Sequence, residues 1–203
     1  MRIIGIDPGT RIAGYGVVDL SEQKNLKAIA AGAWKLDAQK ELPPRLATLA
    51  IEFRRVVETY KPSHICLELS FLADNPRTAL FLGHARGVIL SEAHQLGLVI
   101  SEISATSAKK IISGNGRAEK SAIAKIMSSM LGFNFVNLPY DATDALAIAC
   151  ADAMRNRNSS FANSSVTLES NSSSNENILI DWQKKRKKGR IHLSNFASLL
   201  KAK

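Results

Sequence analysis

The sequence has few cysteines and lacks long apolar runs. Only two cysteines occur among 203 residues, Cys66 and Cys150, and each lies inside an apolar stretch. Two buried thiols are too few for a disulfide framework or a zinc site, and they suit a reducing compartment. The apolar stretch at residues 1–7 is too short for a signal peptide, and no run approaches the length of a bilayer span. We therefore expect a cytoplasmic protein with no membrane partner.

Acidic residues are outnumbered by basic ones. The chain has 27 Lys and Arg against 18 Asp and Glu, a formal net charge of +9. Such an excess favours an anionic partner, with nucleic acid ahead of a membrane surface. The excess is uneven, because residues 1–150 hold 17 basic and 14 acidic residues while residues 151–203 hold 10 and 4. Charge therefore gives weak support to a DNA-binding body and marks a basic tail.

Hydrophobic patterning predicts an α/β domain. Short apolar runs between turn residues predict strands, and apolar residues at helical spacing predict helices. The expected strands are 2–7, 13–20, 25–36, 64–69 and 98–103, and the expected helices are 44–60, 75–95, 119–131 and 141–155. The first three strands follow one another closely, which predicts an antiparallel meander. The later strand–helix–strand units need right-handed crossovers, so we expect a mixed five-stranded sheet flanked by helices.

Composition changes sharply after residue 155. Ser and Asn dominate residues 156–177, and such a segment buries too little apolar surface to fold. Residues 184–190 carry a run of Lys and Arg, which is by default a solvated charge run. The alternative is a sequence-independent tether to DNA. We divide the chain into a folded domain at 1–155 and a disordered linker with a basic tail at 156–203.

Four carboxylates from three distant segments can meet at one edge of this sheet. Asp7 ends the first expected strand, and Glu68 stands near the end of the fourth. Asp141 and Asp144 are three residues apart at the start of the last helix, so both project from one face. Asp7 could instead be a turn residue and Asp141 a helix cap, and for these two acids the structural and functional interpretations are about even. Glu68 and Asp144 adjoin apolar runs, where an unpaired carboxylate costs free energy, and this favours a functional site.

A cleft lined by four carboxylates has a predictable chemistry. The acids repel one another unless cations neutralise them. Mg²⁺ or Mn²⁺ suits such oxygen ligands, and no set of His and Cys offers a zinc alternative. Two such ions about 4 Å apart stabilise both the attacking and the leaving oxygen in phosphodiester hydrolysis. The acids therefore predict a metal-dependent nuclease.

Five segments resemble, in order and spacing, blocks of RuvC, the bacterial Holliday junction resolvase family. The segments are Gly5-Ile6-Asp7-Pro8-Gly9-Thr10-Arg11, Glu68-Leu69-Ser70-Phe71, Gly83-His84-Ala85-Arg86-Gly87, Gly116-Arg117-Ala118-Glu119-Lys120-Ser121 and Asp141-Ala142-Thr143-Asp144-Ala145-Leu146-Ala147. The resemblance covers residues 2–155. It implies an RNase H-like fold and a homodimer that uses Mg²⁺ to make paired symmetric nicks in four-way DNA junctions during recombination and repair. It also implies a branch-migration partner of the RuvAB type.

The resemblance assigns roles to particular residues. It places the four catalytic and metal-binding acids at Asp7, Glu68, Asp141 and Asp144. Lysines of the family correspond to Lys109 and Lys120, and Lys120 would assist the nonbridging oxygens of the scissile phosphate. Phe71 corresponds to an aromatic residue that stacks on an unpaired base, although an ordinary loop Phe is the structural alternative. Leu69 departs from the family, which usually has Gln there.

Basic and glycine residues around these blocks suggest further contacts. Arg77, Arg86 and Arg117 are candidate phosphate contacts, and Arg117 has a solvated charge as its alternative. Gly83 and Gly87 lie four residues apart in an expected helix, where each glycine costs up to about 1 kcal/mol. Close approach of another backbone would explain them. We expect a homodimer interface there, with packing inside one subunit as the alternative.

Three other functions fit part of the sequence. Actin-like ATPases also open with an Asp-x-Gly-Thr loop, but they require a later Asp-Gly pair, which this chain lacks. An RNase H-like nuclease acting on RNA or an RNA–DNA hybrid shares the two-metal chemistry, so the acids alone do not exclude it. A binding-only module for branched DNA is disfavoured, because without metal an acidic cleft repels phosphate.

Overall fold

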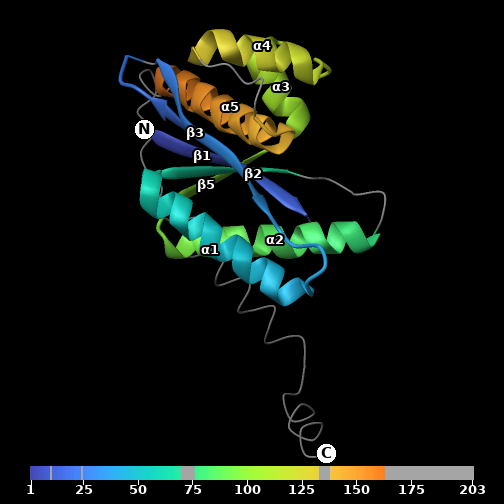
Figure 1. Cartoon of the computed structure of the whole chain (residues 1–203). Helices are drawn as coiled ribbons and strands as arrows, with labels where there is room; N and C mark the ends of the chain where they lie inside the picture. The colour runs from blue at the N-terminus through green and yellow to red at the C-terminus, as the bar shows by residue number, and fades with distance from the viewer. Residues whose placement is uncertain (10, 24, 70–75, 133–137, 163–203) are drawn as a thin grey trace, which may run out of the picture. The chain divides into compact units, whose positions relative to one another are not determined.

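The five strands form one mixed sheet in the order β3-β2-β1-β4-β5 (Figure 1). The structure is a computed structural model that describes residues 1–9, 11–23, 25–69, 76–132 and 138–162. The strands are β1 (Arg2–Asp7), β2 (Ile12–Leu20), β3 (Leu26–Lys35), β4 (His64–Glu68) and β5 (Val99–Ile103). β1, β2 and β3 pair antiparallel, whereas β4 runs parallel to both β1 and β5. The predicted meander and mixed five-stranded sheet are confirmed.

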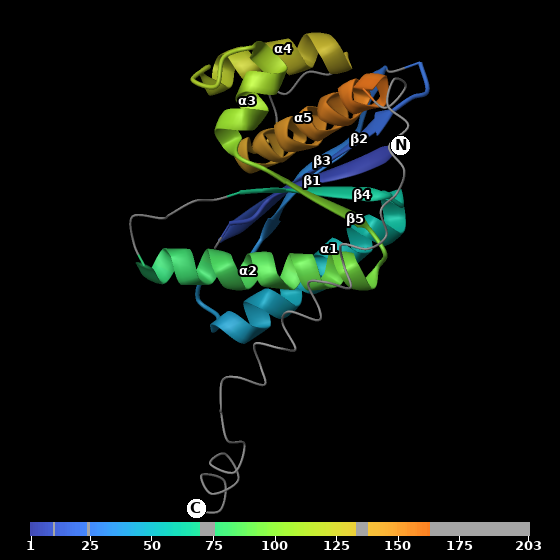
Figure 2. The same cartoon turned by 180° about the vertical axis from the view of Figure 1, so that it is seen from behind.

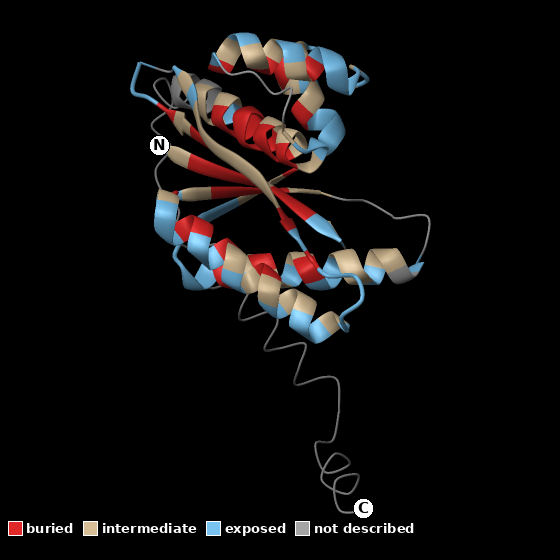
Figure 3. Ribbon diagram, in the orientation of Figure 1, coloured by how far each residue is buried: buried red, intermediate tan, exposed pale blue. Residues whose placement is uncertain are grey.

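Helices cover both faces of the sheet (Figures 1 and 2). α1 (Leu42–Tyr60) and α2 (Pro76–Gln95) lie on one face, and α3 (Ala105–Ser113), α4 (Lys120–Leu131) and α5 (Tyr140–Ala162) lie on the other. Each face buries its own apolar cluster, and the buried positions follow the central strands and the inner sides of the helices (Figure 3). Among the described residues, no helix combines the length and the apolar character that a bilayer crossing requires.

The alternation of side chains along β1 and β4 decides where their last residues point. In β1, Ile6 packs in the cluster formed with α1 and α2. In β4, Leu67 packs in the same cluster. Successive side chains of a strand point to opposite faces. Asp7 and Glu68, each one residue further on, are therefore directed to the face that α5 covers.

Glycines let α5 approach the sheet closely. A Cβ atom added to Gly5 of β1 would stand 2.2 Å from the carbonyl oxygen of Ala145 in α5. At Gly16, which pairs with Gly5 across β1 and β2, the added Cβ would stand 2.6 Å from the Cα atom of Leu146. No side chain fits at either position without moving backbone. The glycines of β1 and β2 thus fix the height of α5 above the sheet.

Helix α3 was missing from the sequence prediction, which passed from β5 directly to α4. Its N-cap is Ser104, whose hydroxyl accepts a hydrogen bond from the Ser107 backbone N–H at 3.1 Å. Gly114 closes the helix with a φ of 77°, a conformation that glycine adopts at little cost. With nine residues and two buried side chains, Ala108 and Ile112, α3 gives a short apolar pattern that is easily taken for a loop.

Helix α5 continues to Ala162, past the end predicted at residue 155. The prediction was wrong here because it followed the change of composition at residue 156, whereas a helix that is already formed extends at low cost through polar residues. α5 completes the compact unit Met1–Ala162. Residues 163–203 lie outside the described residues, so the disordered basic tail stays a prediction.

Replacing Gly5 with alanine tests the close contact of α5 with the sheet. The added methyl group has to displace the backbone of α5, so Gly5→Ala should lower the free energy of unfolding by about 1–3 kcal/mol or more. Gly32→Ala is the matched control in β3, because the atoms nearest to its Cβ would belong to the Tyr15 side chain, which can shift more easily than backbone. Urea unfolding measures both variants. Equal losses in the two would contradict the account.

Candidate active site

Asp7 and Glu68 come together because their strands are parallel neighbours. Ile6 pairs with Leu67 across β1 and β4, so the next residues, Asp7 and Glu68, emerge side by side at the carboxyl ends of both strands. Both side chains are partly buried. The sheet therefore supplies two carboxylates at one edge, as the sequence predicted.

Asp141 and Asp144 come from the first turn of α5. The helix begins at Tyr140, so Asp141 lies inside the first turn and is not the N-cap. Gly14 of β2 pairs with Asp7, and a Cβ atom added to Gly14 would stand 2.0 Å from the Asp141 carbonyl oxygen. The start of α5 therefore lies directly over the strand next to Asp7. We refer to Asp7, Glu68, Asp141 and Asp144 as the acidic cluster.

The pKa of Asp7 is affected by the charges of the other three residues of the acidic cluster. The pKa of the Asp7 carboxyl is raised from its ordinary 3.8 to about 8, and burial is the largest cause. The negative charge of Glu68 and a hydrogen bond with Glu68 are the next causes of this rise, and the charges of Asp144 and Asp141 contribute less. Three carboxylates from other elements thus act on Asp7. The arrangement favours a bound cation, which would remove this repulsion.

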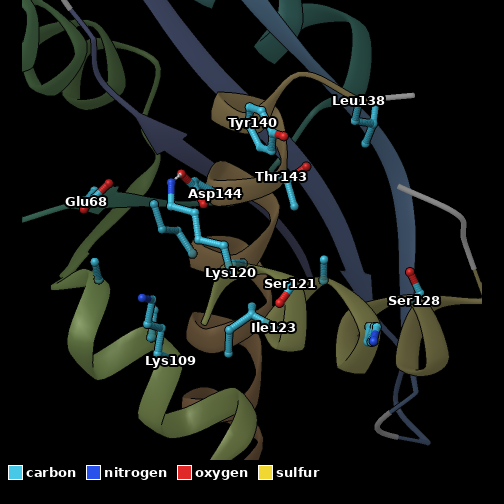
Figure 4. A pocket seen from close by; sticks show the side chains of 16 residues that line it. Glu68, Lys109, Lys120, Ser121, Ile123, Ser128, Leu138, Tyr140, Thr143 and Asp144 are labelled. Carbon is cyan, nitrogen blue, oxygen red and sulfur yellow. Dashed lines mark hydrogen bonds and ion pairs between the residues drawn. The ribbon is translucent and has the colours of Figure 1, made fainter. Parts of the chain in front are cut away.

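Lys120 is the cation that the structure brings to the acids. It is the first residue of α4, and its ammonium group donates a short hydrogen bond to the Asp144 carboxylate, drawn as a dashed line in Figure 4. This bond raises the pKa of Lys120, and the charges of Asp144, Asp7 and Glu68 raise it further, against the opposing effect of burial. Lys120 therefore lies beside the acids, as the sequence predicted.

The carboxylates do not form a finished metal site as they stand. Among the described residues, no three His, Cys, Asp or Glu side chains converge closely enough to hold one ion. Asp144 instead forms an ion pair with Lys120. A cation at the cluster would compete with the ammonium group for Asp144. The oxygen donors suit Mg²⁺ in kind, and closing the site requires side chains to move.

A pocket of about 930 Å³ lies beside the acidic cluster between α3, α4 and α5 (Figure 4). Glu68, Asp144, Lys109 and Lys120 are among the residues that line it, and the amino group of Lys120 is directed to Asp144. The remaining lining is largely apolar, with Ile123 among it. A site that combines carboxylates and lysines suits a substrate that carries phosphate.

The other predicted site residues have different surroundings. Arg117 is exposed in the turn between α3 and α4, and its backbone N–H donates to the Asn115 side chain. Arg86 contacts the backbone of Glu68 and the carboxylate of Glu102. Phe71 lies outside the described residues, as does the side chain of Arg77. Their DNA contacts stay predictions.

The structure adds residues that the sequence did not single out. Tyr140, at the lip of the pocket, is 82% exposed, and Thr143 also lines the pocket. Their position next to Asp141 and Asp144 was a signal that sequence reasoning did not use. Glu102 gave no such signal, because an isolated acid in a strand does not reveal its partner.

Comparisons with known proteins agree on one family. The family model for the crossover junction endodeoxyribonuclease RuvC matches residues 3–152. The RuvC of Bdellovibrio bacteriovorus is 39% identical over 166 residues, covering 82% of this chain and 98% of its own length. The RuvC of Heliobacterium modesticaldum is 38% identical over 156 residues, covering 76% and 96%.

Solved structures agree with this result. The Thermus thermophilus RuvC structure superposes with a TM-score of 0.72 at 25% identity, covering 78% of this chain and 97% of that one. T. thermophilus RuvC in complex with a Holliday junction substrate superposes with a TM-score of 0.70 at 24% identity, covering 77% and 96%. The fold is therefore that of the RuvC structures.

The high pKa of Asp7 predicts a pH-dependent effect on stability. In metal-free protein, the unfolded chain loses the Asp7 proton near pH 3.8 and the folded chain only near pH 8, so the free energy of unfolding falls as pH rises through this window. Asp7→Asn removes the effect and should raise stability more at pH 8 than at pH 5, by about 1 kcal/mol or more.

Urea unfolding in EDTA at the two pH values measures this difference. Asp37→Asn, at an exposed acid outside the cluster, is the matched control and should show no comparable gain. If Asp7→Asn changed the free energy of unfolding equally at both pH values, the raised pKa of Asp7 would be refuted.

Proposed function

This chain belongs to the RuvC family of crossover junction endodeoxyribonucleases, and we propose that it cuts four-way DNA junctions with the acidic cluster. The observation that supports the proposal is the meeting of four carboxylates and Lys120 at one edge of the sheet. The family match favours a junction over RNA or an RNA–DNA hybrid. A binding-only role does not explain why α5, β1 and β4 are arranged to hold repelling acids together.

We propose Mg²⁺ as the cofactor, with Mn²⁺ as a substitute. The acidic cluster offers hard oxygen donors, and the raised pKa of Asp7 reflects burial and, after it, charge repulsion that a divalent cation would relieve. When bound, such ions stabilise the attacking and leaving oxygens during phosphodiester hydrolysis. Asp7 and Glu68 would hold the metal from the sheet, and Asp141 and Asp144 from α5.

The lysines act on the phosphate. With Asp144 as a ligand of the bound ion, the Lys120 ammonium would be free to contact the nonbridging oxygens of the scissile phosphate, where it would offset negative charge in the transition state. Lys109 faces the same pocket and can fix the DNA backbone beside it. A water molecule attacks phosphorus in line, and the leaving oxygen departs on the opposite side. The nicked ends are then substrates for a ligase.

Helix α2 provides the surface for a homodimer. Leu80 is 63% exposed, and Gly83 and Gly87 follow it at helical spacing. An added Cβ atom at either glycine meets nothing within 4 Å among the described residues, so packing inside the subunit does not explain them. A second copy of the chain packed on this stripe would explain both the glycines and the exposed Leu80. Two active sites in one dimer would make the paired symmetric nicks.

The family also suggests a setting for the reaction. A cytoplasmic branch-migration complex of the RuvAB type would present the junction to the dimer. Arg117, Arg77 and Phe71 remain the candidates for further DNA contacts, with Phe71 stacking on an unpaired base.

Cleavage of a labelled synthetic four-way junction with Mg²⁺ tests the proposed function. Wild type should nick the junction in symmetric pairs and leave linear duplex and RNA–DNA hybrid intact. Asp7→Asn should bind the junction but cut it slower by about 100-fold or more, because a proposed metal ligand is lost. Asp37→Asn should cut like wild type. If wild type cut only the hybrid, the proposed substrate would be wrong. If wild type bound the junction without cutting it, the proposed nuclease activity would be wrong.

Replacing Leu80 with arginine tests the dimer. A charged side chain in an apolar interface should dissociate it, so Leu80→Arg should behave as a monomer in light scattering at micromolar concentration and lose paired nicking. Ile51→Arg is the matched control, because Ile51 of α1 is also 63% exposed. This variant should remain dimeric. A monomeric wild type would contradict the proposed interface.

A further inference from the structure

Arg86 of α2 connects two strands at the end that carries Glu68. One amino group of its guanidinium donates a hydrogen bond of 2.8 Å to the backbone carbonyl oxygen of Glu68. The other amino group forms a short ion pair with the carboxylate of Glu102 in β5. The Arg86 side chain is only 23% exposed. Both sides of the guanidinium are therefore engaged within the protein.

The contact is made at the last residue of β4, where the sheet itself gives less support. The pairing between β1 and β4 ends at Ile6 and Leu67, one residue before Glu68. On the other side, Glu68 pairs with Ile103, and the Leu69 backbone N–H donates to the Ile103 carbonyl oxygen at 2.8 Å. Arg86 supplies the additional donor that holds the Glu68 carbonyl in place.

Arg86 reaches this strand end from the face opposite the acidic cluster. Ile103 packs in the cluster of α3, α4 and α5, so its neighbour Glu102 is directed to the face of α2. The Arg86–Glu102 ion pair therefore lies on the α2 face, whereas the Glu68 side chain is directed to the α5 face. Arg86 therefore contacts Glu68 through its backbone carbonyl and not through its carboxylate.

We propose that Arg86 is a positioning residue, through which α2 and β5 fix the backbone of Glu68 and hold its carboxylate in place within the acidic cluster. The proposal rests on the proposed function of Glu68 as a metal-binding acid. It differs from the phosphate contact that the sequence suggests for Arg86. A phosphate would have to displace Glu102 from a guanidinium that is mostly buried.

Arg86→Gln, Arg86→Lys and Glu102→Gln, each in the full-length chain, test the proposal. Groups that orient a metal ligand typically contribute 10- to 100-fold in metal affinity or activity, so Arg86→Gln should lower the single-turnover rate by about 10- to 100-fold. Its affinity for the junction in the absence of metal should match wild type. Glu102→Gln should cause a smaller loss, because Arg86 keeps its bond to Glu68. Arg86→Lys, which retains a single donor group, should fall between wild type and Arg86→Gln.

A second readout needs no cleavage. Mn²⁺ added to the DNA-free protein should raise the melting temperature, and Arg86→Gln should need about 10-fold more Mn²⁺ than wild type for half of that rise. This measurement separates the two proposals. If wild type failed to cut junctions, the proposed function would fall, while an unshifted Mn²⁺ midpoint in Arg86→Gln would overturn the role of Arg86.

Arg54→Gln is the matched control for general loss of stability. Arg54 of α1 forms a two-point ion pair with Glu92 of α2, so it also connects α2 to a neighbouring element, but it does not contact β4. This variant should keep the wild-type rate and Mn²⁺ midpoint. Equal slowing in Arg54→Gln and Arg86→Gln would overturn the proposal. Weaker junction binding and a lower salt slope in Arg86→Gln, with a wild-type rate at saturation, would identify a phosphate contact instead.

Discussion

Helix α5 crosses β1 and β2 where both strands carry glycine, and this contact positions the chemistry of the protein. A Cβ atom at Gly5, Gly14 or Gly16 would stand 2.0–2.6 Å from the backbone of α5. The helix is thereby held directly over the strand end that carries Asp7, with Asp141 and Asp144 in its first turn. If α5 or β1 shifted by the width of a side chain, Asp7 would be separated from Asp141 and Asp144. The close packing of α5 on β1 and β2 thus sets the geometry of the site.

This geometry opposes the stability of the metal-free protein. Burial, together with the neighbouring acids, raises the pKa of Asp7 to about 8, which means that the ionised form of Asp7 is disfavoured at this position. Lys120 offsets part of the negative charge through Asp144, and bound divalent cations would offset more. The protein tolerates the repulsion because buried apolar clusters on both faces of the sheet hold the elements in place.

The elements that carry the site were largely predictable, because strand alternation and helical spacing are local signals. β1, β4 and the start of α5 stand within one residue of their expected positions, and the acids follow from them. The short helix α3 escaped prediction because nine residues carry too little periodicity, and the true end of α5 was hidden by a change of composition. The Arg86–Glu68 and Lys120–Asp144 contacts join residues 18 and 24 positions apart. Such pairs depend on how the helices pack, which no local pattern encodes.

The claim that the acidic cluster binds the metal for phosphodiester hydrolysis is tested most directly by a crystal structure of the protein soaked in Mn²⁺, with anomalous diffraction. The account predicts an anomalous peak between Asp7, Glu68 and the start of α5, within about 2.0–2.3 Å of carboxylate oxygens, with Asp144 released from Lys120. Well-ordered crystals that show no peak at this edge of the sheet, or ions only elsewhere, would contradict it.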